Sequence, residues 1–295
     1  MKRPADPSRV GSLLAWARNR LEGLEAAHPA QDARELLEWV AKTDSIWRIK
    51  EPIEPELAER FYNAVELRAS RIPLQRITGR MYFRGLTLHS AEQVFICRPE
   101  TEIVAGIGIE AARQVIAEQG TVRIVDLCTG SGAIAIACAT ELPEAQVWAV
   151  ELAQEALALA QRNIETLVPS RVQLLRGDAT HPRTLADLDG RIDIVISNPP
   201  YVPADEAPTQ VEAGFDPPLA LFGGGEAGMD IPRGIISRAA GLLKEGGLLV
   251  LEHSASQAAL MREAARETGF IEVFTKKDLA GAPRVLVATR GRISQ

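Results

Sequence analysis

The sequence is poor in the residues that build disulfides and metal sites. Its 295 residues include three cysteines and four histidines. Cys97, Cys128 and Cys138 show neither paired spacing nor a metal-ligand pattern, and the histidines are scattered. We therefore expect free thiols and no structural metal.

Long apolar runs are absent as well. No stretch approaches 18 consecutive apolar residues, and the chain opens on a polar segment rather than on the apolar core of a signal peptide. We expect no membrane span and a cytoplasmic location. The hydrophobic fraction of 46% and the charged fraction of 24% are those of a globular protein with room for a large and a smaller domain.

Positive charge is not in excess either. The 33 Lys and Arg residues are outnumbered by 39 Asp and Glu residues, which gives a formal net charge of −6. Proteins that bind duplex DNA usually carry a basic surface. We therefore expect no direct DNA binding, although a local basic patch is compatible with this composition.

Residues 1–78 predict a small helical domain. Apolar residues recur at helical spacing from Ser8 to about residue 27, from Asp32 onward, and from Glu56 to about Arg71. Ser8 is the candidate N-cap of the first stretch. Proline-marked segments separate these stretches. No catalytic pattern lies in them, so two interpretations stay open: a folding appendage, or a substrate-docking domain if the rest of the chain is an enzyme.

Residues 79–97 predict a β-hairpin linker with short β-like runs at 81–83, 86–88 and 94–96. Residues 98–295 predict an α/β domain. Beyond residue 98, apolar β-branched runs alternate with helical patterns, which is typical of a doubly wound, Rossmann-like sheet. We expect strands at 121–127, 146–150, 172–175, 192–197, 248–251, 271–274 and 284–288, with a turn at 245–247. No helix separates the last two, so we expect them to form an antiparallel hairpin at the sheet edge.

Asn198, Pro199, Pro200 and Tyr201 directly follow the apolar strand 192–197. Ligands collect where strands of an open α/β sheet end. The two prolines stiffen the loop and donate no backbone hydrogen bond. The Asn198 side-chain oxygen and the Pro199 carbonyl can accept bonds from a planar NH2 group, on which the Tyr201 ring can stack. The segment predicts a catalytic site for an amide or an amino-substituted base, with a strand-closing turn as the structural alternative.

A glycine-rich turn joins the predicted strand 121–127 to a helix. It consists of Cys128, Thr129, Gly130, Ser131 and Gly132. Glycines at such a turn let a ligand approach the backbone and the helix N-terminus. The spacing Gly130-x-Gly132-x-x-Ala135 also fits a relaxed dinucleotide pattern, so a nicotinamide oxidoreductase is an alternative. That alternative leaves residues 198–201 unexplained.

Three further polar segments adjoin the predicted strands and helices. Glu151 ends the second strand, where an acid can bind ribose hydroxyls, or cap the next helix instead. Asp178, followed by Ala179, can accept a hydrogen bond from an adenine amino group or simply form a turn. Arg98-Pro99-Glu100-Thr101-Glu102 opens a helix and can be read as a charged helix start.

Together these segments resemble class I S-adenosylmethionine-dependent methyltransferases. More narrowly, the chain resembles the HemK/PrmC family, which methylates the glutamine of the Gly-Gly-Gln motif in class I peptide chain release factors. The resemblance covers about residues 74–290. It rests on the motifs at 79–83, 98–102, 126–132, 198–201 and 219–221, on Leu251-Glu252 and Gln257, and on Asp278-Leu279-Ala280-Gly281 followed by Arg284.

The resemblance implies a cofactor, a partner and a set of site residues. Residues 198–201 would be catalytic, and a class I release factor would be the partner. S-adenosylmethionine would be bound by Cys128, Thr129, Gly130, Ser131, Gly132, Glu151, Asp178, Ala179 and Asn198. Two related enzymes stay open as alternatives: a glutamine methyltransferase of a ribosomal protein, and an N6-adenine nucleic-acid methyltransferase that acts on a flipped base.

The chain departs from the usual family pattern at several positions. They are Cys97, Cys128, Phe215-Asp216-Pro217, His253-Ser254 and Ala282-Pro283. None of them lies within residues 198–201. We expect them to affect how the long loop 202–229 closes over the substrate and how tightly the cofactor is bound.

Overall fold

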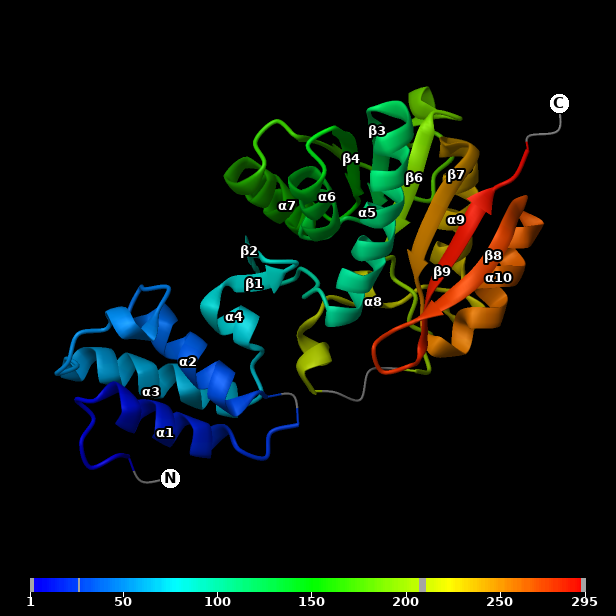
Figure 1. Ribbon diagram of the computed structural model, residues 1–295. Coiled ribbons are helices and arrows are strands. Elements are labelled where there is room, and N and C mark those ends of the chain that lie inside the picture. The colour runs from blue at the N-terminus through cyan, green and yellow to red at the C-terminus, as the bar shows by residue number, and fades with distance from the viewer. Residues whose placement is uncertain (1–2, 26, 207–210, 293–295) are drawn as a thin grey trace. The chain divides into compact units, whose positions relative to one another are not determined.

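The computed structural model describes most of the chain, in two compact units whose elements Figure 1 labels. The described residues are 3–25, 27–206 and 211–292. The expected domains also include residues 1–2, 26, 207–210 and 293–295, which lie outside the described residues. One unit is formed by residues 1–80 with 208–215, and the other by residues 81–207 with 216–295.

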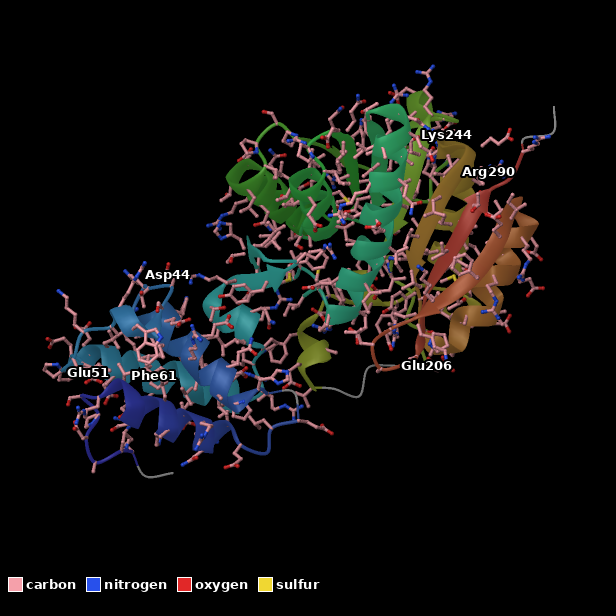
Figure 2. All side chains as sticks on the ribbon, in the orientation of Figure 1. Asp44, Glu51, Phe61, Glu206, Lys244 and Arg290 are labelled. Carbon is pink, nitrogen blue, oxygen red and sulfur yellow. The ribbon has the colours of Figure 1, made fainter. Side chains whose placement is uncertain are left out.

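The first unit is helical, as the sequence predicts. Its α-helices in the described part are α1 (Val10–Leu21), α2 (Pro29–Val40), α3 (Pro55–Ala69) and α4 (Leu74–Thr78). Proline begins α2 and α3, where its missing N–H costs no helical hydrogen bond. Leu13, Leu36 and Phe61 bring the first three helices together in a dry core. Phe61, labelled in Figure 2, is fully buried.

The expected N-cap of the first helix is wrong. The sequence indicates Ser8, but α1 begins at Val10 and its N-cap is Arg9. The Ser8 hydroxyl instead donates to Asp6 Oδ1 at 2.6 Å, which also accepts the Ser8 backbone N–H. A nearby carboxylate thus binds the side chain that the helix terminus would have used.

A short segment from the long loop belongs to the helical unit. It forms the 3-10 helix η3 (Val211–Phe215), whose Glu212 is buried. Arg71 binds both carboxylate oxygens of Glu212, at 2.6 and 2.7 Å, and holds its pKa down at about 2. The buried Arg68 donates to the same carboxylate and, at 2.8 Å, to Asp32. These charges fix η3 on α3.

The second unit contains a mixed sheet. In the described residues its strands are β3 (Val122–Leu127), β4 (Ala145–Glu151), β5 (Val172–Arg176), β6 (Ile192–Ser197), β7 (Leu243–Glu252), β8 (Phe270–Lys277) and β9 (Pro283–Arg290). Their order is β5-β4-β3-β6-β7-β9-β8. The first five are parallel, and β9 pairs antiparallel with both β7 and β8. The predicted doubly wound sheet with an antiparallel last strand is confirmed.

Helices cover both faces of this sheet, as Figure 1 shows. On one face, α5 (Pro99–Gln119), α6 (Ala133–Glu141) and α7 (Gln154–Leu167) pack on an apolar cluster that includes Ile124 and Ile194. On the other, α9 (Asp230–Leu242) and α10 (Ala258–Glu267) pack on a cluster that includes Val125 and Val195. Burial on both faces explains why the parallel strands read as continuous apolar runs.

Two local expectations in this unit need correction. The predicted hairpin is present as β1 (Arg80–Phe83) and β2 (Leu86–His89), but residues 94–96 form no strand. The Val94 and Ile96 side chains are buried, and the Ile96 N–H donates to Asp216 rather than to a neighbouring strand. The turn expected at 245–247 lies inside β7, where the pairing with β6 shifts register.

None of the helices in the described ranges is both long enough and apolar enough to cross a membrane.

Candidate active site

The predicted site residues meet at one edge of the sheet. Because β3 to β7 are parallel in space, their carboxyl ends share that edge. The glycine-rich turn follows β3, Glu151 ends β4, Asn198 follows β6, and Glu252 ends β7. The fold therefore brings together side chains that are far apart in the sequence.

The Asn198 side chain uses its NH2 group in a hydrogen bond within the protein. Its Nδ2 donates to Thr101 Oγ1 at 3.0 Å, across 97 residues of sequence. In the part of the chain that the structure describes, neither Asn198 Oδ1 nor the Pro199 carbonyl oxygen accepts a hydrogen bond. The loop thus keeps two acceptors available. That they bind a substrate NH2 group remains a prediction.

A buried carboxylate supports Thr101 and Tyr201. Thr101 Oγ1 donates to Glu252 Oε2 at 2.9 Å, and the Tyr201 hydroxyl donates to Glu252 Oε1 at 3.0 Å. Glu252 is 1% exposed. Burial raises its pKa to about 7, although both hydrogen bonds and the nearby Arg284 charge act in the opposite direction. Burial also raises the pKa of Tyr201, and the Glu252 charge adds to this effect.

The backbone of Tyr201 is fixed by Gln257 and by the loop that contains Gly228. Gln257 Nε2 donates to the Tyr201 carbonyl at 2.6 Å and to the Ala227 carbonyl at 2.7 Å. A Cβ atom on Gly228 would lie 2.4 Å from the Tyr201 carbonyl oxygen, and Gly228 has φ +68°. Only glycine fits such a close approach in this conformation.

The segment 98–102 does more than start a helix. Pro99 is the first residue of α5, as the helix-start interpretation requires. However, Arg98 also binds Asp216, Thr101 binds Asn198, and the Glu102 carboxylate accepts the Arg84 backbone N–H at 3.1 Å. Asp216, one of the departures from the family pattern, thus has a charged partner in this segment.

The glycine-rich turn alternates left-handed residues. Cys128, Gly130 and Gly132 have φ of +63°, +57° and +86°. Cys128, one of the departures from the family pattern, therefore adopts a conformation that glycine enters without the Cβ penalty. A Cβ atom on Gly130 would meet nothing within 4 Å, so its backbone faces open space. A ligand can approach the turn at that point.

Asp126, the acid before this turn, has one oxygen without a partner. Its Oδ2 accepts hydrogen bonds from Thr129 Oγ1 and, at 3.1 Å, from the Ala135 N–H. Its Oδ1 is buried without a partner among the described residues. Burial raises the Asp126 pKa to about 7.

Glu151 and Asp178 both hold backbone N–H groups. Glu151 Oε2 accepts from Gly130 at 2.8 Å, and its Oε1 accepts from residues 152 and 153 at 2.9 Å. Asp178 Oδ1 accepts from the Thr180 N–H and hydroxyl, so the turn interpretation applies to that oxygen. Ala179 is buried beside it. That these residues bind a cofactor remains a prediction.

Three residues of the assembled network are absent from the site list predicted from sequence: Thr101, Glu252 and Gln257. Thr101 and Glu252 bind the residues 198–201 through side chains, and Gln257 binds their backbone. The sequence contains a signal that could have identified Glu252 as a site residue. Glu252 lies at the end of a buried strand, and Asn198 directly follows another. Within residues 3–25, 27–206 and 211–292, no three His, Cys, Asp or Glu side chains are arranged to hold a metal ion.

Comparisons with known proteins identify relatives over almost the whole chain. Residues 12–79 match the PrmC N-terminal domain, and residues 107–215 match the methyltransferase small domain. A solved methyltransferase from Pyrococcus furiosus is 19% identical, with a TM-score of 0.50 over 71% of this chain and 91% of that chain. This likeness shows the fold.

Curated relatives are considerably more similar. A release factor glutamine methyltransferase from Bifidobacterium longum is 45% identical over 77% of this chain and 79% of that protein. One from Streptomyces coelicolor is 40% identical over 94% of this chain and 96% of that protein. With this identity over nearly its full length, the chain belongs to the release factor glutamine methyltransferase family.

Proposed function

We propose that this chain transfers a methyl group from S-adenosylmethionine to the side-chain amide nitrogen of the glutamine in the Gly-Gly-Gln motif of class I release factors. One structural observation supports the proposal. Asn198 turns its NH2 group to Thr101 and keeps Oδ1 available beside the Pro199 carbonyl. Two adjacent acceptors match the two N–H groups of a glutamine side chain.

Asn198 and Pro199 would act by positioning the substrate amide. An amide nitrogen is a poor nucleophile because its lone pair is delocalised into the carbonyl. Hydrogen bonds from both substrate N–H groups to Asn198 and Pro199 would localise electron density on that nitrogen and aim it. Orientation of this kind contributes up to about 7 to 11 kcal/mol in favourable cases. S-adenosylmethionine, when bound, supplies a methyl group on an electrophilic sulfonium.

The edge formed by β3, β4 and β5 fits the cofactor. Gly130 presents its backbone to open space, and the buried Asp126 Oδ1 has no protein donor in the described part of the chain. Residues 128–132 would hold the amino-acid end, Glu151 the ribose, and Asp178 with Ala179 the adenine. Glu151 already accepts three backbone N–H groups, so it would bind ribose while it fixes the Gly130 turn.

We further propose that the helical unit serves as the docking part for the release factor. It carries no cofactor pattern, and residues 12–79 match a domain of its own, the PrmC N-terminal domain. At the catalytic edge, the flanking glycines of the motif would bring no side chains to clash as the glutamine enters.

Mass spectrometry of the acceptor tests the proposed function directly. Purified protein incubated with S-adenosylmethionine should add one methyl group to the glutamine of the Gly-Gly-Gln motif in an intact release factor. A ribosomal-protein substrate and an adenine-containing oligonucleotide should be incubated in parallel. Methylation of adenine, or of the ribosomal protein alone, would replace this function by one of the two alternatives.

Replacing Glu151 with alanine should weaken S-adenosylmethionine binding. The change removes a charged acceptor for the ribose and the anchor of the Gly130 N–H, and charged hydrogen bonds are worth about 1.5 to 3 kcal/mol. Calorimetric titration with the cofactor measures the effect. The matched control is Glu155→Ala, which removes an exposed acid from the first turn of α7. An affinity like that of the control would leave Glu151 with a structural role alone.

A further inference from the structure

Thr101 links Asn198 to the buried carboxylate of Glu252. It lies in the first turn of α5 and is 1% exposed. Its Oγ1 accepts from Asn198 Nδ2 at 3.0 Å and donates to Glu252 Oε2 at 2.9 Å. A hydroxyl has a single proton, so the two bonds must run in one direction.

Glu252 sets that direction. In its ionised form a carboxylate only accepts hydrogen bonds, and the Tyr201 hydroxyl already donates to its other oxygen. While Glu252 is ionised, the Thr101 proton is therefore directed at this carboxylate, and Thr101 can offer Asn198 only a lone pair. Asn198 must then present its NH2 group to Thr101, which turns Oδ1 away from α5.

We propose that Thr101 is a positioning residue that holds the Asn198 amide in the orientation that presents Oδ1 to the substrate. The inference rests on the proposed function, because it takes the Asn198 oxygen as an acceptor for the glutamine NH2 group. Without the Thr101 hydroxyl, the Asn198 amide is free to rotate by half a turn. Its NH2 group would then meet the substrate NH2 group, and two donors cannot form a hydrogen bond.

A purely structural role for Thr101 makes a different prediction. In that case its hydroxyl would only satisfy the buried Glu252 carboxylate, and its loss would harm the enzyme whether or not Asn198 is present. In the positioning role, Thr101 acts through Asn198, so its loss should have no further effect once the Asn198 amide is gone. A double-mutant cycle separates the two roles, because contacting residues that act as a unit are non-additive.

The experiment compares Thr101→Val and Thr101→Ser, each alone and combined with Asn198→Ala. Single-turnover methylation of the release factor and calorimetric affinity for S-adenosylmethionine are measured for each variant. We expect Thr101→Val to lower the methylation rate about tenfold, the value of one hydrogen bond. Cofactor affinity should be unchanged, and Thr101→Ser should restore most of the rate. In the Asn198→Ala background, Thr101→Val should change the rate less than about twofold.

Thr268→Val is the matched control, since it removes a half-buried threonine hydroxyl that donates to the Ala264 carbonyl at the end of α10. If valine at position 101 prevents folding, Thr101→Ala removes the same hydroxyl and takes its place in the cycle. Equal rate losses in both backgrounds, or a Thr101→Val rate like the wild type, would overturn the positioning role. A wild-type enzyme that leaves the release factor unmethylated would instead contradict the proposed function.

Discussion

Replacing Asn198 with alanine is expected to lower the rate of release factor methylation by roughly 10²-fold or more, by analogy with the loss of one transition-state hydrogen bond elsewhere. The variant removes the oxygen that would receive the substrate N–H group, but it leaves the Pro199 carbonyl in place. It also frees Thr101, whose proton stays with Glu252. The glutamine amide of the substrate would then be held by one hydrogen bond, to the Pro199 carbonyl. Its nitrogen would no longer be held in a fixed orientation.

The affinity for S-adenosylmethionine should fall much less, because Glu151 and the turn 128–132 are untouched. Single-turnover kinetics with an intact release factor give the rate, and calorimetric titration gives the cofactor affinity. A parallel loss of both quantities would mean that Asn198 serves mainly the cofactor. An unchanged rate would remove Asn198 from the chemistry altogether.

Sequence reasoning is most accurate where local pattern and burial agree. The strand 192–197 has the predicted bounds, and β3 begins one residue after the start of the predicted strand 121–127. Both are apolar β-branched runs that are buried on both faces, so their limits are marked in the sequence. The order of the last strands is less accessible. Because β9 inserts between β7 and β8, its place depends on packing of the whole sheet rather than on its own residues.

The catalytic edge could be predicted in its loops but not in their partners. Residues 198–201 carry a local signal in their two prolines and their place after a strand. Thr101 lies 97 residues earlier and is joined to Asn198 by one hydrogen bond, which no periodicity records. The Arg71 pair with Glu212 spans 141 residues and is equally silent in the sequence. Long-range polar contacts of this kind appear only when the fold is assembled.

The buried ion pairs of the helical unit lead to the second prediction of a large effect, which concerns stability rather than turnover. Replacing Arg68 with methionine should destabilise the helical unit by about 3 to 5 kcal/mol. The Arg68 side chain is 3% exposed and donates to Asp32 at 2.8 Å. Methionine fills similar space without charge, so the nearly buried Asp32 carboxylate would lose this cation while it remains out of water.

Urea denaturation followed by tryptophan fluorescence is well suited to this measurement. Of the four tryptophans, Trp16, Trp39 and Trp47 lie in the helical unit and only Trp148 in the other, so the signal reports mainly on the unit that changes. The matched control is Arg20→Met. It breaks the ion pair that Arg20 of α1 forms with Glu66 of α3. The Arg20 and Glu66 side chains are 32% and 50% exposed.

An exposed pair of this kind is worth no more than about 1 kcal/mol. Both variants remove one arginine from the same small bundle, but the Arg68 partners Asp32 and Glu212 are buried carboxylates and the Arg20 partner Glu66 is exposed. The double replacement Asp32→Leu with Arg68→Met should recover much of the lost stability, because it removes the stranded carboxylate as well. Equal destabilisation by Arg68→Met and Arg20→Met would show that burial does not strengthen the ion pairs of Arg68.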